Sequence, residues 1–198
     1  MAGQTGRTVP AQVAAKLYGA VDVIAENGLA NTKIEQIAAA SGVPKATLYY
    51  YFAGKEEILA FLLRDSLAYL AGAVATAAEA PGSGRDRLAA VVAVQIEHTL
   101  SNSATSRALI GDLGRAAQLP ELAQAVQAAF YDPIAQVLRD GADDGSLRAV
   151  ADPDEAALSI FGTVIMTGLI HAVVGTERSA ETITASVLDL LLQGLRPG

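Results

Sequence analysis

The chain has 198 residues, of which 52% are hydrophobic, with a formal net charge of −7 and no cysteine. This length allows one large domain or two small ones with a substantial core, and the composition is too apolar for a disordered protein. The lack of cysteine excludes disulfides, thiolate metal sites and cysteine nucleophiles, and is compatible with a reducing cytoplasm.

The N-terminal segment is expected to be a flexible arm over residues 1–9 without the apolar region of a signal peptide. A first helix is predicted to begin near Pro10 and to end at Asn27-Gly28, where glycine permits a C-terminal stop. Its apolar residues keep helical spacing: Val13, Leu17, Ala20, Val21 and Ile24.

The next stretch predicts a helix-turn-helix. Thr32 and Glu35 have the spacing of a capping box, so the first of its helices is expected to begin at Thr32. Gly42 can adopt the left-handed conformation that ends this helix, and Pro44 predicts the first turn of the second helix. Leu48 and Phe52 then form the buried i, i+4 pair of the second helix.

Apart from the buried pair, the second helix carries a lysine, an alanine, a threonine and three tyrosines, which are residue types that suit contact with DNA. Small residues admit the wall of a major groove, while Lys, Thr and Tyr donate hydrogen bonds to phosphate oxygens. Lys55 adds a cation at the start of the next helix. In the alternative structural interpretation, Tyr49 is a packing residue and the lysines are ordinary solvated side chains.

The sequence here resembles the DNA-binding region of the tetracycline-repressor (TetR) family of transcriptional regulators. The resemblance rests on Ile37-Ala38, Ser41-Gly42-Val43, Thr47-Leu48-Tyr49-Tyr50-Tyr51-Phe52 and Lys55-Glu56, and it covers roughly the first third of the chain. Tyr51 departs from the family, which frequently has His there, and Pro10-Ala11-Gln12-Val13 replaces a region that commonly carries Arg. The DNA-binding residues that we expect are Thr32, Lys33, Lys45, Ala46, Thr47, Tyr49, Tyr50, Tyr51 and Lys55.

The negative net charge at first opposes a nucleic-acid partner. However, residues 1–64 hold six Lys or Arg against five acidic residues, and the remainder holds eight against sixteen. Since charges beyond a Debye length of about 8–10 Å are largely screened, the acidity outside the DNA-binding region is tolerable. We expect modest affinity for DNA with a steep salt dependence.

The rest of the chain is predicted to be helical. A long helix runs from Lys55 to before Pro81, followed by helices at about 85–101, 104–117, 120–142 with a bend at Asp132-Pro133, 153–174 and 179–195. The fold class is therefore all-α. A three-helix helix-turn-helix domain is expected at 1–54, and a larger effector-binding and dimerisation domain at 55–198.

Residues 156–175 carry no formal charge and are long enough to span a membrane. Polar residues interrupt this segment and no cluster of Lys or Arg flanks it, which favours a buried helix in a soluble protein. We expect it to pair with the last helix and, across a two-fold axis, to form a homodimer through four helices. Such a dimer would place two DNA-binding domains on a pseudo-palindromic operator.

The resemblance also implies a small-molecule effector in the C-terminal domain, where the apolar residues indicate a lipophilic ligand of unknown identity. The candidate lining residues are Leu63, Leu67, Ile96, His98, Leu109, Leu113, Phe130, Tyr131, Ile134, Phe161 and Ile165, for each of which plain core is the alternative. His98 and His171 have no carboxylate at i±3 or i±4, so we expect neither to bind a metal.

No catalytic motif is present, and neither a cofactor nor an enzymatic activity is expected. The sequence thus predicts a cytoplasmic, dimeric, ligand-responsive repressor of transcription. Two alternatives remain: an all-helical enzyme that binds small molecules, and a helix-turn-helix module that docks a protein.

Overall fold

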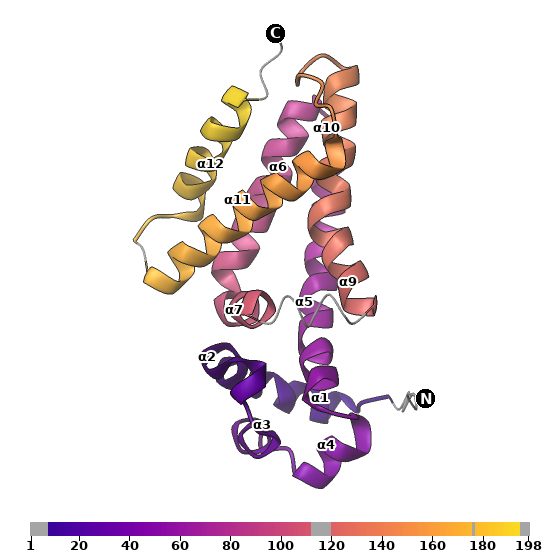
Figure 1. The fold of residues 1–198 in the computed structure, drawn as a ribbon, viewed down its shortest axis with the longest axis vertical. Coiled ribbons are helices and arrows are strands. Elements are labelled where there is room, and N and C mark those ends of the chain that lie inside the picture. The colour runs from indigo at the N-terminus through magenta and orange to yellow at the C-terminus, as the bar shows by residue number, and fades with distance from the viewer. Residues whose placement is uncertain (1–7, 112–119, 176, 195–198) are drawn as a thin grey trace. The chain divides into compact units, whose positions relative to one another are not determined.

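The computed structural model describes residues 8–111, 120–175 and 177–194, and every regular element in these ranges is helical, as the sequence predicts (Figure 1). The elements are α1 (Ala11–Leu17), the 3₁₀ turn η1 (Tyr18–Ala20), α2 (Val21–Asn31), α3 (Ile34–Ser41), α4 (Lys45–Tyr51), α5 (Lys55–Ala78), α6 (Gly84–Ser101), α7 (Ser103–Gly111), α9 (Pro120–Val126), the π-helix η2 (Gln127–Tyr131), α10 (Asp132–Asp143), α11 (Pro153–Val174) and α12 (Ala180–Gly194).

The described residues group into two compact units. Within the described ranges, the first consists of residues 8–66, 104–111 and 120–123, and the second of residues 67–103, 124–175 and 177–194. The division falls inside α5, between Ser66 and Leu67. Because compactness does not say which residues bind DNA, the functional boundary after residue 54 stays a prediction.

The first predicted helix is divided by a 3₁₀ turn into α1 and α2. Gly19 lies in this turn, where a Cβ atom would be 3.1 Å from the carbonyl oxygen of Ala40 in α3. The turn therefore lets η1 approach α3 closely. At the predicted stop, Gly28 interrupts the helical geometry of α2, since its φ is 72°.

The predicted capping box at Thr32 and Glu35 is wrong by one residue. Helix α3 begins at Ile34 with Lys33 as its N-cap, and the Lys33 N–H donates to the side-chain oxygen of Gln36 at 2.7 Å. Thr32 instead ends α2, where its hydroxyl donates to the Gly28 carbonyl at 2.8 Å. The local pattern allowed either register, and the Gly28 carbonyl at the break accepts from both the N–H and the hydroxyl of Thr32, which fixes Thr32 as the end of α2.

The turn and second helix of the helix-turn-helix follow the prediction. Gly42 has φ of 66°, in the left-handed region that ends α3. Pro44 immediately precedes α4, and both Leu48 and Phe52 are buried. Helix α4 is only seven residues long, so its stability comes from this packing rather than from its own hydrogen bonds.

In the second unit, α6 packs against α10, α11 and α12 (Figure 1). The contact between α6 and α10 depends on two glycines: a Cβ atom on Gly84 would lie 2.3 Å from the Cα of Gly141. Asp152 caps α11 as predicted, since its carboxylate accepts from the N–H groups of Asp154 and Glu155.

At the predicted bend, Asp132-Pro133, the π-helix η2 passes directly into α10, and the bend itself stays a prediction. Pro133 has no N–H to donate to the carbonyl four residues earlier, which belongs to Ala129. The side chain of Gln95 from α6 donates to this carbonyl at 3.1 Å. A buried amide thus compensates for the proline, and the helix stays continuous. The segment 112–117 of the helix predicted at 104–117 lies outside the described residues.

Two of the helices, α5 and α11, are long and apolar enough to cross a membrane by length and composition. The core helices of a soluble protein pass the same criteria. In the most apolar part of each helix, 39% of the α5 residues and 33% of the α11 residues are buried within the chain.

Gly84→Ala should destabilise the protein by about 1–3 kcal/mol, because the added methyl group would overlap the backbone of Gly141. Gly72→Ala is the matched control within α5: its Cβ would meet nothing within 4 Å, so the substitution should stabilise by up to about 1 kcal/mol. Urea unfolding measures both. Equal midpoints for the two variants would contradict the close contact between α6 and α10.

Candidate DNA-binding surface and ligand groove

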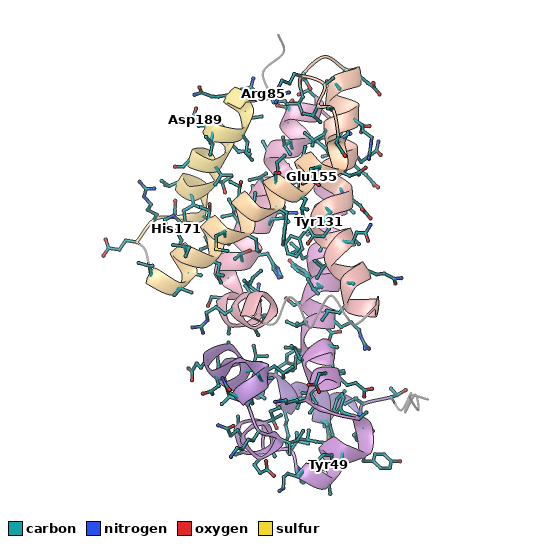
Figure 2. All side chains as sticks on the ribbon, in the orientation of Figure 1. Tyr49, Arg85, Tyr131, Glu155, His171 and Asp189 are labelled. Atoms are coloured by element: carbon teal, nitrogen blue, oxygen red, sulfur yellow. The ribbon has the colours of Figure 1, made fainter. Side chains whose placement is uncertain are left out.

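The exposed side of α4 carries the residues predicted to bind DNA. Tyr49 and Tyr50 are 61% and 53% exposed, and Figure 2 shows Tyr49 projecting outward from α4. Lys45 and Ala46 are also exposed, whereas Thr47 and Tyr51 are half-buried. The Tyr51 ring meets the Tyr50 ring edge to face, with centroids 4.9 Å apart. Burial of Leu48 therefore leaves a continuous face of a cation, a small residue and phenols.

Lys45 is held by an acidic neighbour. Its ammonium lies 2.9 Å from a carboxylate oxygen of Glu35 in α3, with both side chains about half exposed. The hydrogen bond from Lys45 lowers the pKa of the Glu35 carboxyl, and the same bond raises the pKa of the Lys45 ammonium. A phosphate would have to compete with Glu35 for this cation.

Two other predicted DNA-binding residues make contacts that stabilise the unit itself. The Lys55 ammonium donates to the carbonyl oxygens of Ala30 at 2.8 Å and Thr32 at 3.1 Å, and so binds the carboxyl end of α2. Thr32 is buried, with its hydroxyl on Gly28. Lys33, at the start of α3, is exposed. Contacts of these residues with phosphate stay predictions.

A second connection in this unit joins η1 to α5. The Tyr18 hydroxyl donates to the carboxylate of Asp65 at 2.5 Å. Burial, together with the adjacent carboxylate, raises the pKa of Tyr18 to about 12. The phenol therefore stays protonated and able to donate at all physiological pH values.

In the second unit, α12 and the α5–α6 pair enclose a groove of about 790 Å³, within the range of small-molecule sites. We call this the α12 groove. Its lining residues are Tyr69, Leu70, Ala73, Ala93, Val94, Glu97, His98, Ser101, Asn102, Ala180, Glu181, Thr184, Ala185 and Leu188.

Of the predicted lining residues with described side chains, His98 alone lines this groove. Leu109 lies in α7 but its side chain is not described, and Leu113 lies outside the described residues. The other predicted residues apart from Tyr131 are buried core: Leu63, Leu67, Ile96, Phe130, Ile134, Phe161 and Ile165. Leu63 belongs to the first unit and the rest to the second.

Two of these core residues form an aromatic cluster with Tyr131. Phe161 of α11 lies 5.0 Å from the Phe130 ring and 4.8 Å from the Tyr131 ring, measured between centroids. Figure 2 shows Tyr131 turned toward the interior beside α11, and burial raises the pKa of its phenol. The cluster is packed ring against ring.

The sequence analysis missed most of the groove because its residues come from three separate helices. One signal was available: Glu181, Thr184, Ala185 and Leu188 recur at helical spacing and include both small and polar residues, as in a partly open face. Among the residues that the structure describes, no three His, Cys, Asp or Glu side chains gather in a geometry that could hold a metal ion.

The apolar surface of α11 is exposed over much of its length. Met166, Ile170, Val173 and Val174 are each at least 50% exposed, and Leu190 of α12 is 68% exposed. Apolar side chains this large and this close together are typical of an interface with another protein molecule.

Comparison with known proteins agrees with this arrangement. The model for the bacterial regulatory proteins of the tetR family matches residues 17–61, and the model for the tetracyclin repressor-like C-terminal domain matches residues 81–195. A helix-turn-helix with an exposed second helix, followed by a helical domain, is the arrangement of a transcriptional regulator. The chain belongs to the tetR family, and as such it is a ligand-responsive DNA-binding regulator rather than an enzyme.

Two of the three similar proteins cover nearly the whole chain. The fatty acid metabolism regulator protein of Bacillus subtilis (strain 168) is 26% identical over 179 residues, which are 89% of this chain and 91% of that protein. The regulator RutR of Escherichia coli (strain K12) is 40% identical over 65 residues, 33% of this chain and 31% of RutR. The crystal structure of FadR from Bacillus subtilis with stearoyl-CoA superposes with a TM-score of 0.75 at 23% identity, covering 93% of this chain and 98% of that chain.

Glu35→Gln should strengthen DNA binding by about three- to tenfold at low salt, because it frees Lys45 and removes a negative charge near the phosphates. The gain should shrink as salt rises. Glu26→Gln removes the same charge from an exposed position of α2 and serves as the control. Fluorescence anisotropy with labelled operator measures both, and equal affinities would show that Lys45 does not approach DNA.

Proposed function

We propose that the protein is a cytoplasmic homodimeric repressor that leaves a pseudo-palindromic operator when a small lipophilic effector binds. The observation that carries this proposal is the exposed α4 face: Leu48 is buried while Lys45, Ala46, Tyr49 and Tyr50 remain accessible. In this proposal residues 1–54 bind DNA, and residues 55–198 bind the effector and the second subunit. The residues predicted from the sequence, Lys33 and Thr47 among them, make the DNA contacts.

Dimerisation sets the geometry of DNA binding. Two α4 helices enter successive major grooves only when they are about 34–36 Å apart. The exposed apolar residues of α11, together with Leu190, supply a surface for the second copy. An effector that favours a different separation would therefore release the operator. Moving the population from 1:99 to 99:1 needs about 5.5 kcal/mol of differential binding.

The effector is proposed to be lipophilic because most residues of the α12 groove are apolar. The predicted core residues, including Phe130 and Phe161, would become a second part of the site only if the aromatic cluster opened. A further candidate is control of fatty acid metabolism by an acyl-CoA, which is favoured by the relation to the Bacillus subtilis regulator over 91% of that protein's length and by the stearoyl-CoA in the FadR structure.

The test of DNA binding is a footprint of the purified protein on the DNA upstream of its own gene, repeated at two salt concentrations. A genome-wide selection of binding sites follows if that fragment is not bound. We expect protection of a short pseudo-palindrome, with affinity that falls steeply as salt rises. Failure to select any site would favour the enzyme or the protein-docking alternative.

Lys45→Ala should weaken operator binding and reduce the salt slope by about one, since one phosphate contact is lost. Arg85→Ala removes an exposed cation from the second unit and should change neither quantity. Binding isotherms over a range of salt concentrations give both values. An unchanged slope for Lys45→Ala would remove this residue from the DNA contacts.

Ile170→Glu should produce monomers, because Ile170 is 52% exposed on α11 and a charge there would be buried in the dimer. We expect the dimer dissociation constant to rise on the order of 100-fold. Gln124→Glu adds the same charge at an exposed position of α9 and should leave the dimer intact. Analytical ultracentrifugation distinguishes the outcomes, and a dimeric Ile170→Glu variant would move the interface elsewhere.

A further inference from the structure

The α12 groove has an apolar floor and a polar rim. Leu70 of α5 is 1% exposed and forms part of the floor with alanines and with Val94 and Leu188. The rim carries Glu97 of α6 and Glu181 of α12, both of which are exposed. A ligand in this groove would have its body on apolar carbon and its polar end near carboxylates.

The charge of the groove has one sign. The described residues that line it include two glutamates but neither lysine nor arginine. His98 adds no positive charge near neutral pH, because burial lowers the pKa of its imidazole. A ligand that carries phosphate or carboxylate groups would therefore face two negative charges, with neither lysine nor arginine among the described lining residues.

Tyr69 supplies a second feature that favours a cation. Its side chain is 74% exposed at the edge of the groove, and its ring stacks on His98 with centroids 6.2 Å apart and planes 27° apart. The face of a phenol ring attracts ammonium groups, and an aromatic ring beside carboxylates is a general means of binding them.

A second copy of the chain on the exposed apolar surface would leave this groove open. The groove residues Glu181, Thr184, Ala185 and Leu188 occupy one side of α12, since they recur at i, i+3, i+4 and i+7. Leu190 follows Leu188 by two residues, which places it about 200° around the helix. The groove and the proposed dimer surface thus use different sides of α12.

We propose that the α12 groove binds a lipophilic cation, an amine or quaternary ammonium on an apolar body, and that this cation is the effector. The apolar body lies on Leu70, Val94 and Leu188, while the cationic group lies between Glu97, Glu181 and the Tyr69 ring. This inference rests on the proposed function, because it names the effector class of the regulator.

The position of the groove gives the ligand direct access to α5. Tyr69, Leu70 and Ala73 belong to this helix. Asp65, which accepts the Tyr18 hydrogen bond, precedes Tyr69 by one helical turn. A ligand that moved Tyr69 would act on the helix that holds η1, and hence on the element that leads into the helix-turn-helix.

The first experiment compares ligands with the same chain: decyltrimethylammonium, decanol, decanoate and decanoyl-CoA, each below its micelle concentration. Isothermal titration of the full-length protein, at about physiological ionic strength to limit non-specific attraction, measures their affinities. We expect decyltrimethylammonium to bind at least tenfold more tightly than decanoate and decanoyl-CoA, with decanol between. Equal or tighter binding of either anion would overturn the proposal and favour an acyl-CoA effector.

The second experiment locates the binding site. Glu97→Gln and Glu181→Gln should each reduce the affinity for decyltrimethylammonium about three- to tenfold and leave the affinity for decanol unchanged. Glu155→Gln is the matched control, because it removes an exposed negative charge from α11 outside the groove (Figure 2). If all three variants reduce the affinity for decyltrimethylammonium equally, the attraction comes from the net negative charge of the protein, and the groove proposal is wrong.

The third experiment separates this inference from the proposed function. Decyltrimethylammonium should release the wild-type protein from its operator, and Glu97→Gln should need proportionately more ligand. If the protein binds its operator and remains bound at saturating decyltrimethylammonium, the result would overturn only the claim that the cation is the effector. A protein that binds no operator would overturn the proposed function, while the titrations without DNA would still decide whether the groove prefers cations.

Discussion

A single helix, α5, supplies core side chains to both compact units, and the rest of the structure depends on its continuity. Leu59, Leu62 and Leu63 are buried before the division at Ser66, and Leu70 and Val74 are buried after it. An α-helix of 24 residues transmits displacement along its axis because each of its turns is held by backbone hydrogen bonds. At its N-terminal end, α5 binds the carbonyl groups of Ala30 and Thr32 through Lys55. Further along, the same helix forms a wall of the α12 groove.

Several polar side chains in the protein donate hydrogen bonds to backbone carbonyl groups where helices end or depart from regular geometry. Lys55 binds the carboxyl end of α2, Thr32 serves the carbonyl at the break in that helix, and Gln95 serves the carbonyl opposite Pro133. A buried carbonyl without a partner costs about 1–3 kcal/mol, which explains why the Gln95 amide turns inward. The same residue types on α4 stay at the surface, because Leu48 alone occupies the inner side of that short helix over most of its length.

Apolar character alone does not distinguish a ligand site from a core. The aromatic cluster of Phe130, Tyr131 and Phe161 has the composition of a ligand site, but its rings pack against one another. The α12 groove remains open because small residues, Ala73, Ala93 and Ala185 among them, line it where larger side chains would have filled the space. Its charge then determines which polar groups a ligand can carry.

The sequence by itself determined the helical class, the helix-turn-helix and the ends of most helices, because periodicity, glycine turns and caps such as Asp152 act over a few residues. The family resemblance, which rests on the same local region, is confirmed. Only the tertiary structure decided the N-cap at Lys33, the π-helix before Pro133 and the α12 groove. The last two depend on residues far apart in the chain, Gln95 with Ala129 and Tyr69 with Glu181, whose meeting no local pattern encodes.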